Sequence, residues 1–323
     1  MRVGQNPAKS IEQVSQPAAI SAAVVVYIPF LSGYYRDSLE VLKLCLGSLR
    51  QNADLPLDLM VFDNASCDEV RSYLIQEQKE GNIQYLVLSE KNVGKAGGWN
   101  HLFGAAPGEF IAYADSDVYF YPGWLSPKVE ALNSLPQAGM ITGMPMLTPE
   151  EFSTSTVAWA EKQPEIELER GRFFPWEDFW RHAGSLVSEE DKARQFYDEN
   201  NCLRLTWGGN KYYIGASHFQ FVARKKVLQE MLPIPSKRPM GQVRLLDVAI
   251  NEHGYLRLCT DHWYVQHMGN TLPDDTFFAG KPPSATHGGR PHHSRKGIWQ
   301  LKPIRRLLQK LYEWSFSILY RNE

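Results

Sequence analysis

One stretch of this chain, residues 110–125, places an acidic pair directly after a predicted buried strand. Phe110–Ala114 is mostly apolar, which is typical of such a strand. Asp115 and Asp117 follow at once, and Pro122-Gly123 then breaks the chain before an expected helix. Ligands of open α/β sheets bind at the carboxyl ends of strands, and carboxylate oxygens suit Mg²⁺ or Mn²⁺ bridging to a diphosphate. The plainer alternative is that Asp115 caps the helix and Asp117 is only solvated.

Apolar runs and segments of helical spacing alternate through most of the chain. Strands are predicted at 22–28, 57–62, 83–88, 110–114, 138–144, 213–222 and 255–259. Helices are predicted at 37–51, 69–79, 224–231 and 243–252. Strands that alternate with helices favour right-handed βαβ units. The expected fold class is therefore α/β, with a mostly parallel sheet flanked by helices.

Composition allows a large core and gives no reason to expect a nucleic-acid partner. The 323 residues are 43% hydrophobic and 12% aromatic, and the formal net charge is −2. The four cysteines have neither CxxC nor metal-ligand spacing, so we expect reduced thiols in a cytoplasmic protein. They are Cys45, Cys67, Cys202 and Cys259. No apolar run approaches the ~20 residues that a membrane span needs.

Residues 148–212 interrupt the strand–helix rhythm. An aromatic-rich segment at 173–180 precedes a charged, helical segment at 188–199. A long insertion of this kind is either a functional lid or specificity region, or a satellite hydrophobic cluster. Both interpretations stay open.

The end of the chain carries a basic amphipathic pattern. Residues 273–297 are rich in Pro, Gly and His, which is typical of a linker or loop. Apolar residues then recur at helical spacing over 298–323, with Arg305, Arg306 and Lys310 on the other side. Such a helix lies in a membrane interface or docks on the domain or on a partner subunit. The first interpretation predicts peripheral attachment to the inner face of the cell membrane.

Three motifs at successive strand ends give the chain its resemblance to a known family. They are Asp63-Asn64-Ala65-Ser66, Asn92-Val93-Gly94 and Asp115-Ser116-Asp117. In this order they resemble the motifs of the family 2 glycosyltransferases, which have the GT-A fold. The resemblance runs from Val24 to Asn270, and Gly97-Gly98 is closest in style to the rhamnosyl- and galactofuranosyl-transferase branch.

Composition and the resemblance together imply a division of the chain. A flexible leader (1–20) would precede a GT-A domain (21–270) that contains an acceptor-side insertion (148–212). A linker or loop (271–297) and a basic amphipathic helix (298–323) would follow.

On the donor side the resemblance implies a set of residues around the nucleotide sugar. They are Pro29, Asp63, Asn92, Gly94, Lys95, Gly98 and Asp115. Asp63 would accept a hydrogen bond from the nucleobase, although a cap on its own turn is an alternative. The glycines would permit close backbone approach, or else tight helix–strand packing. Trp99 is expected in the core.

The metal site implied by the resemblance pairs the acidic motif with a histidine after the last strand. Asp117 would hold Mn²⁺ or Mg²⁺, and His267 would supply a further ligand. His218 and His262 are weaker alternatives for that ligand. By the same resemblance, Asp115 would lie near the ribose.

An inverting transfer needs a general base for the acceptor hydroxyl. The family uses a carboxylate near the start of a helix that ends at a Gly-Tyr pair, and Asp247 is the match here. The paired acid of the family is absent, because Leu245 and Leu246 precede Asp247. Glu252 and Asp178 are the fallback bases, and Asp247 as a helix-terminal charge is the plain alternative.

The function expected is a metal-dependent inverting glycosyltransferase. It would transfer a sugar from a nucleoside-diphosphate sugar to a glycan or lipid-linked glycan during surface polysaccharide synthesis. A sugar nucleotidyltransferase would carry a Gly-rich loop after the first strand, where Ile28-Pro29-Phe30 stands instead. A non-catalytic nucleotide- or glycan-binding protein of the same fold stays as the alternative.

Overall fold

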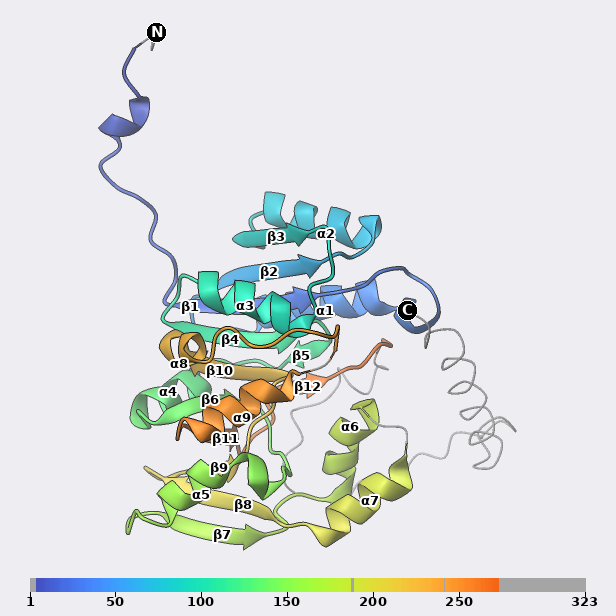
Figure 1. Cartoon of the computed structure of the whole chain (residues 1–323), viewed down its shortest axis with the longest axis vertical. Helices are drawn as coiled ribbons and strands as arrows, with labels where there is room; N and C mark the ends of the chain where they lie inside the picture. Colours follow the sequence, from blue (N-terminus) through green and yellow to red (C-terminus); the bar gives the residue numbers. More distant parts are fainter. Residues whose placement is uncertain (1–3, 187–188, 241, 273–323) are drawn as a thin grey trace. The chain divides into compact units, whose positions relative to one another are not determined.

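Ten strands of the described part of the chain form one mixed sheet. The structure is a computed structural model that describes residues 4–186, 189–240 and 242–272. The strands are β1 (Ile20–Val26), β2 (Asp58–Asn64), β3 (Tyr85–Ser89), β4 (Phe110–Asp115), β6 (Ala138–Thr142), β7 (Glu167–Gly171), β8 (Cys202–Trp207), β9 (Asn210–Ile214), β10 (Gln220–Arg224) and β11 (Leu256–Thr260). Their order is β3-β2-β1-β4-β10-β6-β11-β9-β8-β7 (Figure 1). β5 (Val118–Phe120) and β12 (Val265–His267) form a separate two-stranded sheet.

Most strands of the large sheet point the same way. The pairings β3-β2, β2-β1, β1-β4 and β6-β11 are parallel. β10 is antiparallel to both β4 and β6, and β9, β8 and β7 continue the sheet with antiparallel pairings. Only β10, β9 and β7 of these ten described strands therefore run against the rest. The predicted α/β class with a mostly parallel sheet is confirmed.

Helices cover both faces of the sheet. They are α1 (Ser38–Gln51), α2 (Asp68–Lys79), α3 (Lys95–Ala105), α4 (Ser126–Ser134), α5 (Thr154–Ala160), α6 (Trp176–Leu186), α7 (Glu190–Glu199), α8 (Lys225–Glu230) and α9 (Arg244–Glu252). Alternate residues of β1 enter two different hydrophobic clusters, as the two-residue period of a strand requires. Ala22 and Val24 pack with α1, α2 and α4, whereas Ala23 and Val25 pack with α3, α8 and α9.

Two predicted segments take a different form. The Gly-rich segment after Asn92 forms the start of helix α3. Gly94 is the N-cap residue of this helix and adopts a φ of +77°. The strand predicted at 213–222 is two strands, β9 and β10. Gly215 separates them at a φ of +126°, a conformation that L side chains rarely adopt.

The insertion at 148–212 is part of the sheet and also builds a satellite cluster. It supplies β7, β8 and residues 210–212 of β9, and Tyr212 of β9 pairs with Thr260 of β11. Helices α6 and α7 pack together over a small cluster that includes Phe174 and Tyr197. A satellite cluster is thus present, whereas a role of the region as a lid or specificity region stays a prediction.

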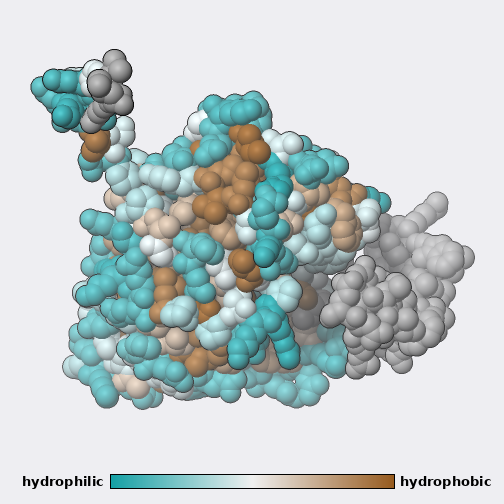
Figure 2. All heavy atoms as spheres, turned by 45° about the horizontal axis from the view of Figure 1, so that its top comes forward, coloured by the Kyte–Doolittle hydropathy of each residue, from teal (hydrophilic) through white to brown (hydrophobic). Residues whose placement is uncertain are grey.

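The edge strand β3 leaves apolar side chains exposed. Tyr85, Val87 and Leu88 are each more than a third exposed. Figure 2 turns this end of the sheet forward, and hydrophobic atoms gather there among hydrophilic ones.

The tail of the chain lies outside the described residues. All described residues belong to one compact unit. The predicted helix at 298–323, and the predicted linker from residue 273 onward, are not among the described residues. Within the described ranges, no helix has the length and apolar character to cross a membrane.

Candidate active site

The carboxylate of Asp115 has two protein partners at the end of β4. Lys95 Nζ lies 2.6 Å from Oδ2, and the hydroxyl of Tyr113 donates a 2.6 Å hydrogen bond to Oδ1. The ammonium group also lies 5.4 Å from the ring centre of Trp99, which is fully buried as expected. Asp115 does not cap α4, since the N-cap residue there is Leu125.

The first turn of α3 is held against a distant loop. Ser236 Oγ accepts a hydrogen bond from the amide of Gly97 and donates one to the carbonyl of Val93. The amide of Lys95 donates to the Pro239 carbonyl. A Cβ on Gly94 would lie 2.5 Å from Ser236 Oγ, so only glycine allows this loop to approach so closely.

Gly98 packs helix α3 onto the sheet. A Cβ at this position would lie 2.8 Å from a methyl group of Val25 and 3.3 Å from the ring of Phe62. Tight helix–strand packing therefore accounts for glycine here, whereas the predicted contact of Gly98 with a donor stays a prediction.

The end of β2 is tied to the Asn92 loop by side-chain amides. Asn64 donates to Asn92 Oδ1 at 2.9 Å and accepts a 2.8 Å bond from the Val93 amide. Asn92 Oδ1 also accepts from the Gly94 amide at 2.8 Å. The strand end and the start of α3 are thus fixed relative to one another.

Asp63 is fully buried beside this network. Its Oδ1 accepts from the Ser66 amide at 3.2 Å, so the predicted turn cap is present. Burial raises the pKa of Asp63, although the bonds from Ser66 and the charge of Arg71 oppose this. Ser66 Oγ also accepts from the amide of Ile28 at 3.0 Å, which holds half-buried Pro29 next to the same turn.

Asp117 and His267 meet although they are far apart in the sequence. β5 and β12 pair in antiparallel fashion, and His267 Nε2 lies 3.2 Å from Asp117 Oδ2. Asp117 Oδ1 is buried and has no hydrogen-bond partner among the described residues. Burial lowers the pKa of His267, but the charge of Asp117 and its hydrogen bond outweigh this and raise the pKa overall. Asp117 is therefore more than a solvated surface charge.

Helix α6 of the insertion borders this pair. Ser185 Oγ lies 3.0 Å from His267 Nδ1, and the ring of His182 lies 6.2 Å from that of His267. His182 is 9% exposed, and its Nδ1 lacks a hydrogen-bond partner in the described part of the chain. The sequence did not indicate either α6 residue, because the insertion carries no strand–helix rhythm.

An oxygen–nitrogen pair with one unpartnered carboxylate oxygen suits Mn²⁺ or Mg²⁺. Asp117 and His267 supply such a pair. Among the described residues, no group of three or more His, Cys, Asp or Glu side chains is arranged to hold a metal. A diphosphate or water would have to complete the coordination.

Both carboxylate oxygens of Asp247 are occupied. Arg257 Nη2 lies 2.7 Å from Oδ1, and His218 Nδ1 lies 2.7 Å from Oδ2. Asp247 is 5% exposed and Arg257 is 2% exposed. Of the fallback bases, Glu252 is exposed, and Asp178 is buried on α6 with its pKa raised by burial.

Residues 28–183 match the family model described as Glycosyl transferase family 2. Over these residues the chain is similar to the family 2 glycosyltransferases. A Nostoc sp. protein named as an uncharacterized glycosyltransferase is 23% identical over 135 residues, which cover 40% of this chain and 42% of that protein. The predicted resemblance to this family is thus confirmed over residues 28–183. Because the match spans less than half of the Nostoc protein, the activity, substrates and partners of the whole chain are proposals.

Solved structures resemble this chain only distantly. TarS of S. aureus, residues 1–349, is 15% identical with a TM-score of 0.45, and the match covers 76% of this chain and 59% of that one. A Pyrobaculum calidifontis mannosyltransferase in complex with GDP-Man and Mn²⁺ is 14% identical with a TM-score of 0.44, covering 76% and 55%.

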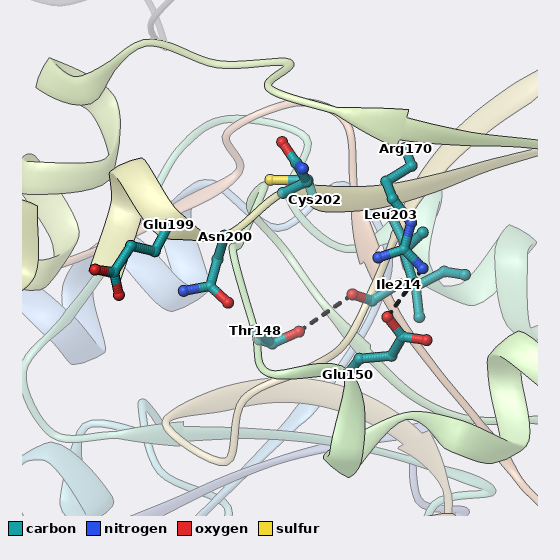
Figure 3. A pocket seen from close by; sticks show the side chains of 9 residues that line it. Thr148, Glu150, Arg170, Glu199, Asn200, Cys202, Leu203 and Ile214 are labelled. Atoms are coloured by element: carbon teal, nitrogen blue, oxygen red, sulfur yellow. Dashed lines mark hydrogen bonds and ion pairs between the residues drawn. The ribbon is translucent and has the colours of Figure 1, made fainter. Parts of the chain in front are cut away.

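A polar cavity of about 160 Å³ lies in the insertion of the domain (Figure 3). Thr148 Oγ1 donates to the Ile214 carbonyl at 3.2 Å, and Arg170 forms a 3.1 Å ion pair with Glu150. The lining contains none of the residues predicted for donor, metal or base. The cavity is therefore separate from the cluster around Asp115.

Proposed function

We propose that the chain is a metal-dependent, inverting glycosyltransferase that uses a nucleoside-diphosphate sugar. The single observation that carries this proposal is the convergence of Lys95, Asp115, Asp117 and His267 beyond the end of β4. In an open α/β sheet this is the edge at which ligands bind. An ammonium group suits the diphosphate and an oxygen–nitrogen pair suits a divalent cation.

The donor would lie along the strand ends from β2 to β4. Asp63, with one carboxylate oxygen lacking a hydrogen-bond partner among the described residues, would accept from the nucleobase beside Pro29. Asn92 and Asp115 would contact the ribose, and Lys95 would contact the diphosphate. Asp115 would hold the ammonium group of Lys95 in place, since the two side chains already form an ion pair.

Asp117 and His267 would hold the cation. When bound, a divalent cation neutralises the charge that develops on the departing nucleoside diphosphate. Asp117 offers an oxygen without a hydrogen-bond partner in the described ranges, and Ser185 fixes the far side of the His267 ring.

A panel of nucleotide sugars tests the proposal. The full chain is titrated with UDP-, GDP- and dTDP-sugars in Mn²⁺ by calorimetry, and release of nucleoside diphosphate is followed with and without EDTA. We expect at least one donor to bind and to turn over only with metal. Asp117→Asn should remove turnover, whereas Asp261→Asn, at an exposed site, should not. Failure of every donor to bind would exclude the proposed function.

The acceptor side of the proposal rests on the sequence. We propose a glycan or lipid-linked glycan acceptor in surface polysaccharide synthesis, because of the basic pattern at 298–323, which lies outside the described residues. That pattern also supports a cytoplasmic protein bound at the inner face of the cell membrane. Sedimentation of the full chain with anionic lipid vesicles, compared with neutral ones, tests the binding.

A non-catalytic nucleotide- or glycan-binding protein is the second candidate. The observation that favours it is that both oxygens of Asp247, the predicted base, already have protein partners. Binding of a donor without turnover in any metal would select this candidate.

A further inference from the structure

Three side chains connect the interior of the domain to the edge of the candidate site. Arg257 is fixed by the Ala216 and Phe152 carbonyls and pairs with Asp247. Asp247 in turn binds His218, whose side chain is 26% exposed. Exposure increases along this series from 2% at the Arg257 side chain to 7% at Asp247 and 26% at His218. The imidazole is therefore the member of the series that an acceptor can reach.

The contacts of Asp247 define the tautomer of His218. An ionised carboxylate only accepts hydrogen bonds, so Nδ1 of the imidazole must be the donor in the 2.7 Å bond. In the neutral ring, Nε2 then carries the lone pair. No described residue forms a hydrogen bond to Nε2. This nitrogen is a base on a half-buried ring whose orientation Asp247 fixes.

His218 borders the same cluster as the proposed donor site. Its ring centre lies 6.3 Å from that of Trp99, which Lys95 Nζ approaches to 5.4 Å. The next residue, Phe219, accepts a 2.8 Å hydrogen bond from the amide of Asp115. The short segment between β9 and β10 thus connects His218 directly to the end of β4.

We propose that His218, positioned by Asp247, is the general base of the transfer, an inference that rests on the proposed function. Nε2 takes the proton of the acceptor hydroxyl while its oxygen forms a bond to the anomeric carbon. The bond from that carbon to the diphosphate oxygen breaks, and its electron pair leaves with the nucleoside diphosphate. Asp247 stabilises the imidazolium that results, as a positioning residue.

Chemical rescue tests the role of His218. The probe is a nucleotide sugar that the wild type hydrolyses, with Mg²⁺ in place of Mn²⁺ because imidazole binds Mn²⁺. We expect His218→Ala to lower kcat about 100-fold or more while its Kd for the donor stays within about twofold. Added imidazole should restore part of the rate. Asp247→Asn should lower kcat without rescue.

A second histidine–aspartate pair provides the matched control. His262 Nδ1 lies 2.6 Å from Asp261 Oδ1, and the His262 side chain is 72% exposed. His262→Ala should change neither kcat nor Kd, and imidazole should not affect it. Circular dichroism and melting curves check that every variant is folded.

An activity-independent measurement completes the test. In ¹⁵N NMR spectra of the full chain, the neutral ring of His218 should carry its proton on Nδ1, and the opposite tautomer would overturn the inference. Retention of more than a tenth of the wild-type kcat in His218→Ala would also overturn it. So would loss of activity in His218→Ala without imidazole rescue. If no donor binds the wild type, the proposed function itself fails; if donors turn over normally without His218, only this inference fails.

Discussion

Lys95 and Asp115 form a 2.6 Å ion pair that joins the first turn of α3 to the end of β4. Both side chains are largely buried, at 11% and 22% exposure, so the pair costs less to hold in place than one between mobile surface chains. The pair orients the Lys95 ammonium group before any donor arrives.

Replacing that ammonium group should weaken donor binding. We expect Lys95→Met to raise the Kd of a nucleoside diphosphate about tenfold or more, because a charge-assisted contact with phosphate contributes about 1.5–3 kcal/mol. Isothermal titration calorimetry measures this change. Lys91→Met removes an exposed ammonium group four residues away and should leave the Kd unchanged. Equal affinities for the two variants would show that Lys95 does not face the diphosphate.

Removing the histidine of the Asp117–His267 pair should weaken metal binding. We expect His267→Ala to raise the Mn²⁺ concentration for half-maximal donor binding at least about tenfold, as the loss of a ligand or its support typically does. Calorimetric titrations at fixed donor and varied Mn²⁺ measure it. His253→Ala, at an exposed site after α9, serves as the control. An unchanged Mn²⁺ requirement would remove His267 from the metal site.

The buried Lys128 should make stability depend on pH. Its side chain is fully buried, its Nζ has no hydrogen-bond partner among the described residues, and burial lowers its pKa to about 7 from 10.5. Below pH 7 both the folded and unfolded states are protonated, so the full cost of burying the charge applies. Between pH 7 and 10.5 only the unfolded state holds the proton, and this cost fades as the pH rises.

Lys128→Met should therefore stabilise the fold most at low pH. We expect its free energy of unfolding to exceed that of the wild type by a few kcal/mol at pH 6, and by much less at pH 10. Urea denaturation at both pH values measures the difference. Lys79→Met, at an exposed position of α2, should show no such trend. A difference that is constant with pH would contradict the prediction.

Two glycines of α3 should respond in opposite ways to alanine. Gly98→Ala should cost about 1–3 kcal/mol, because its Cβ would meet Val25 at 2.8 Å. Gly104 is exposed on the same helix, and the nearest atom to its added Cβ is 3.9 Å away. Gly104→Ala should stabilise the fold by up to about 1 kcal/mol through helix propensity. Thermal unfolding distinguishes these outcomes, and destabilisation of equal size in both would show that packing against β1 is not the cause.

Much of the fold could be predicted from local sequence because the strands and helices around β1–β4 follow regular periods. The sequence does not predict helix α3, because glycine is a poor helix former. Close packing against Val25 accounts for the glycine at position 98 of this helix. The break at Gly215 was missed for a similar reason: a Cβ would clash with Thr148, a residue far away in the sequence.

The candidate site shows the same limit. The family resemblance implied that Asp117 and His267 belong together, and the structure brings them to 3.2 Å. The predicted roles in donor and metal binding stay predictions. Neither the pairing of Asp247 with Arg257 nor the position of His218 has a local signal, because each depends on which strands become neighbours.

The pairing of β9 with β11 limits how residues 148–212 can vary. Residues 148–212 are not a separate flap of the domain, since Tyr212 at their end pairs with Thr260 of β11 in the sheet. A hybrid enzyme that borrows this region from a relative must therefore keep that strand register. A junction placed inside β9 could leave one edge of β11 unpaired. A shift of one residue in the β9 register would turn the β9 side chains to the opposite face of the sheet.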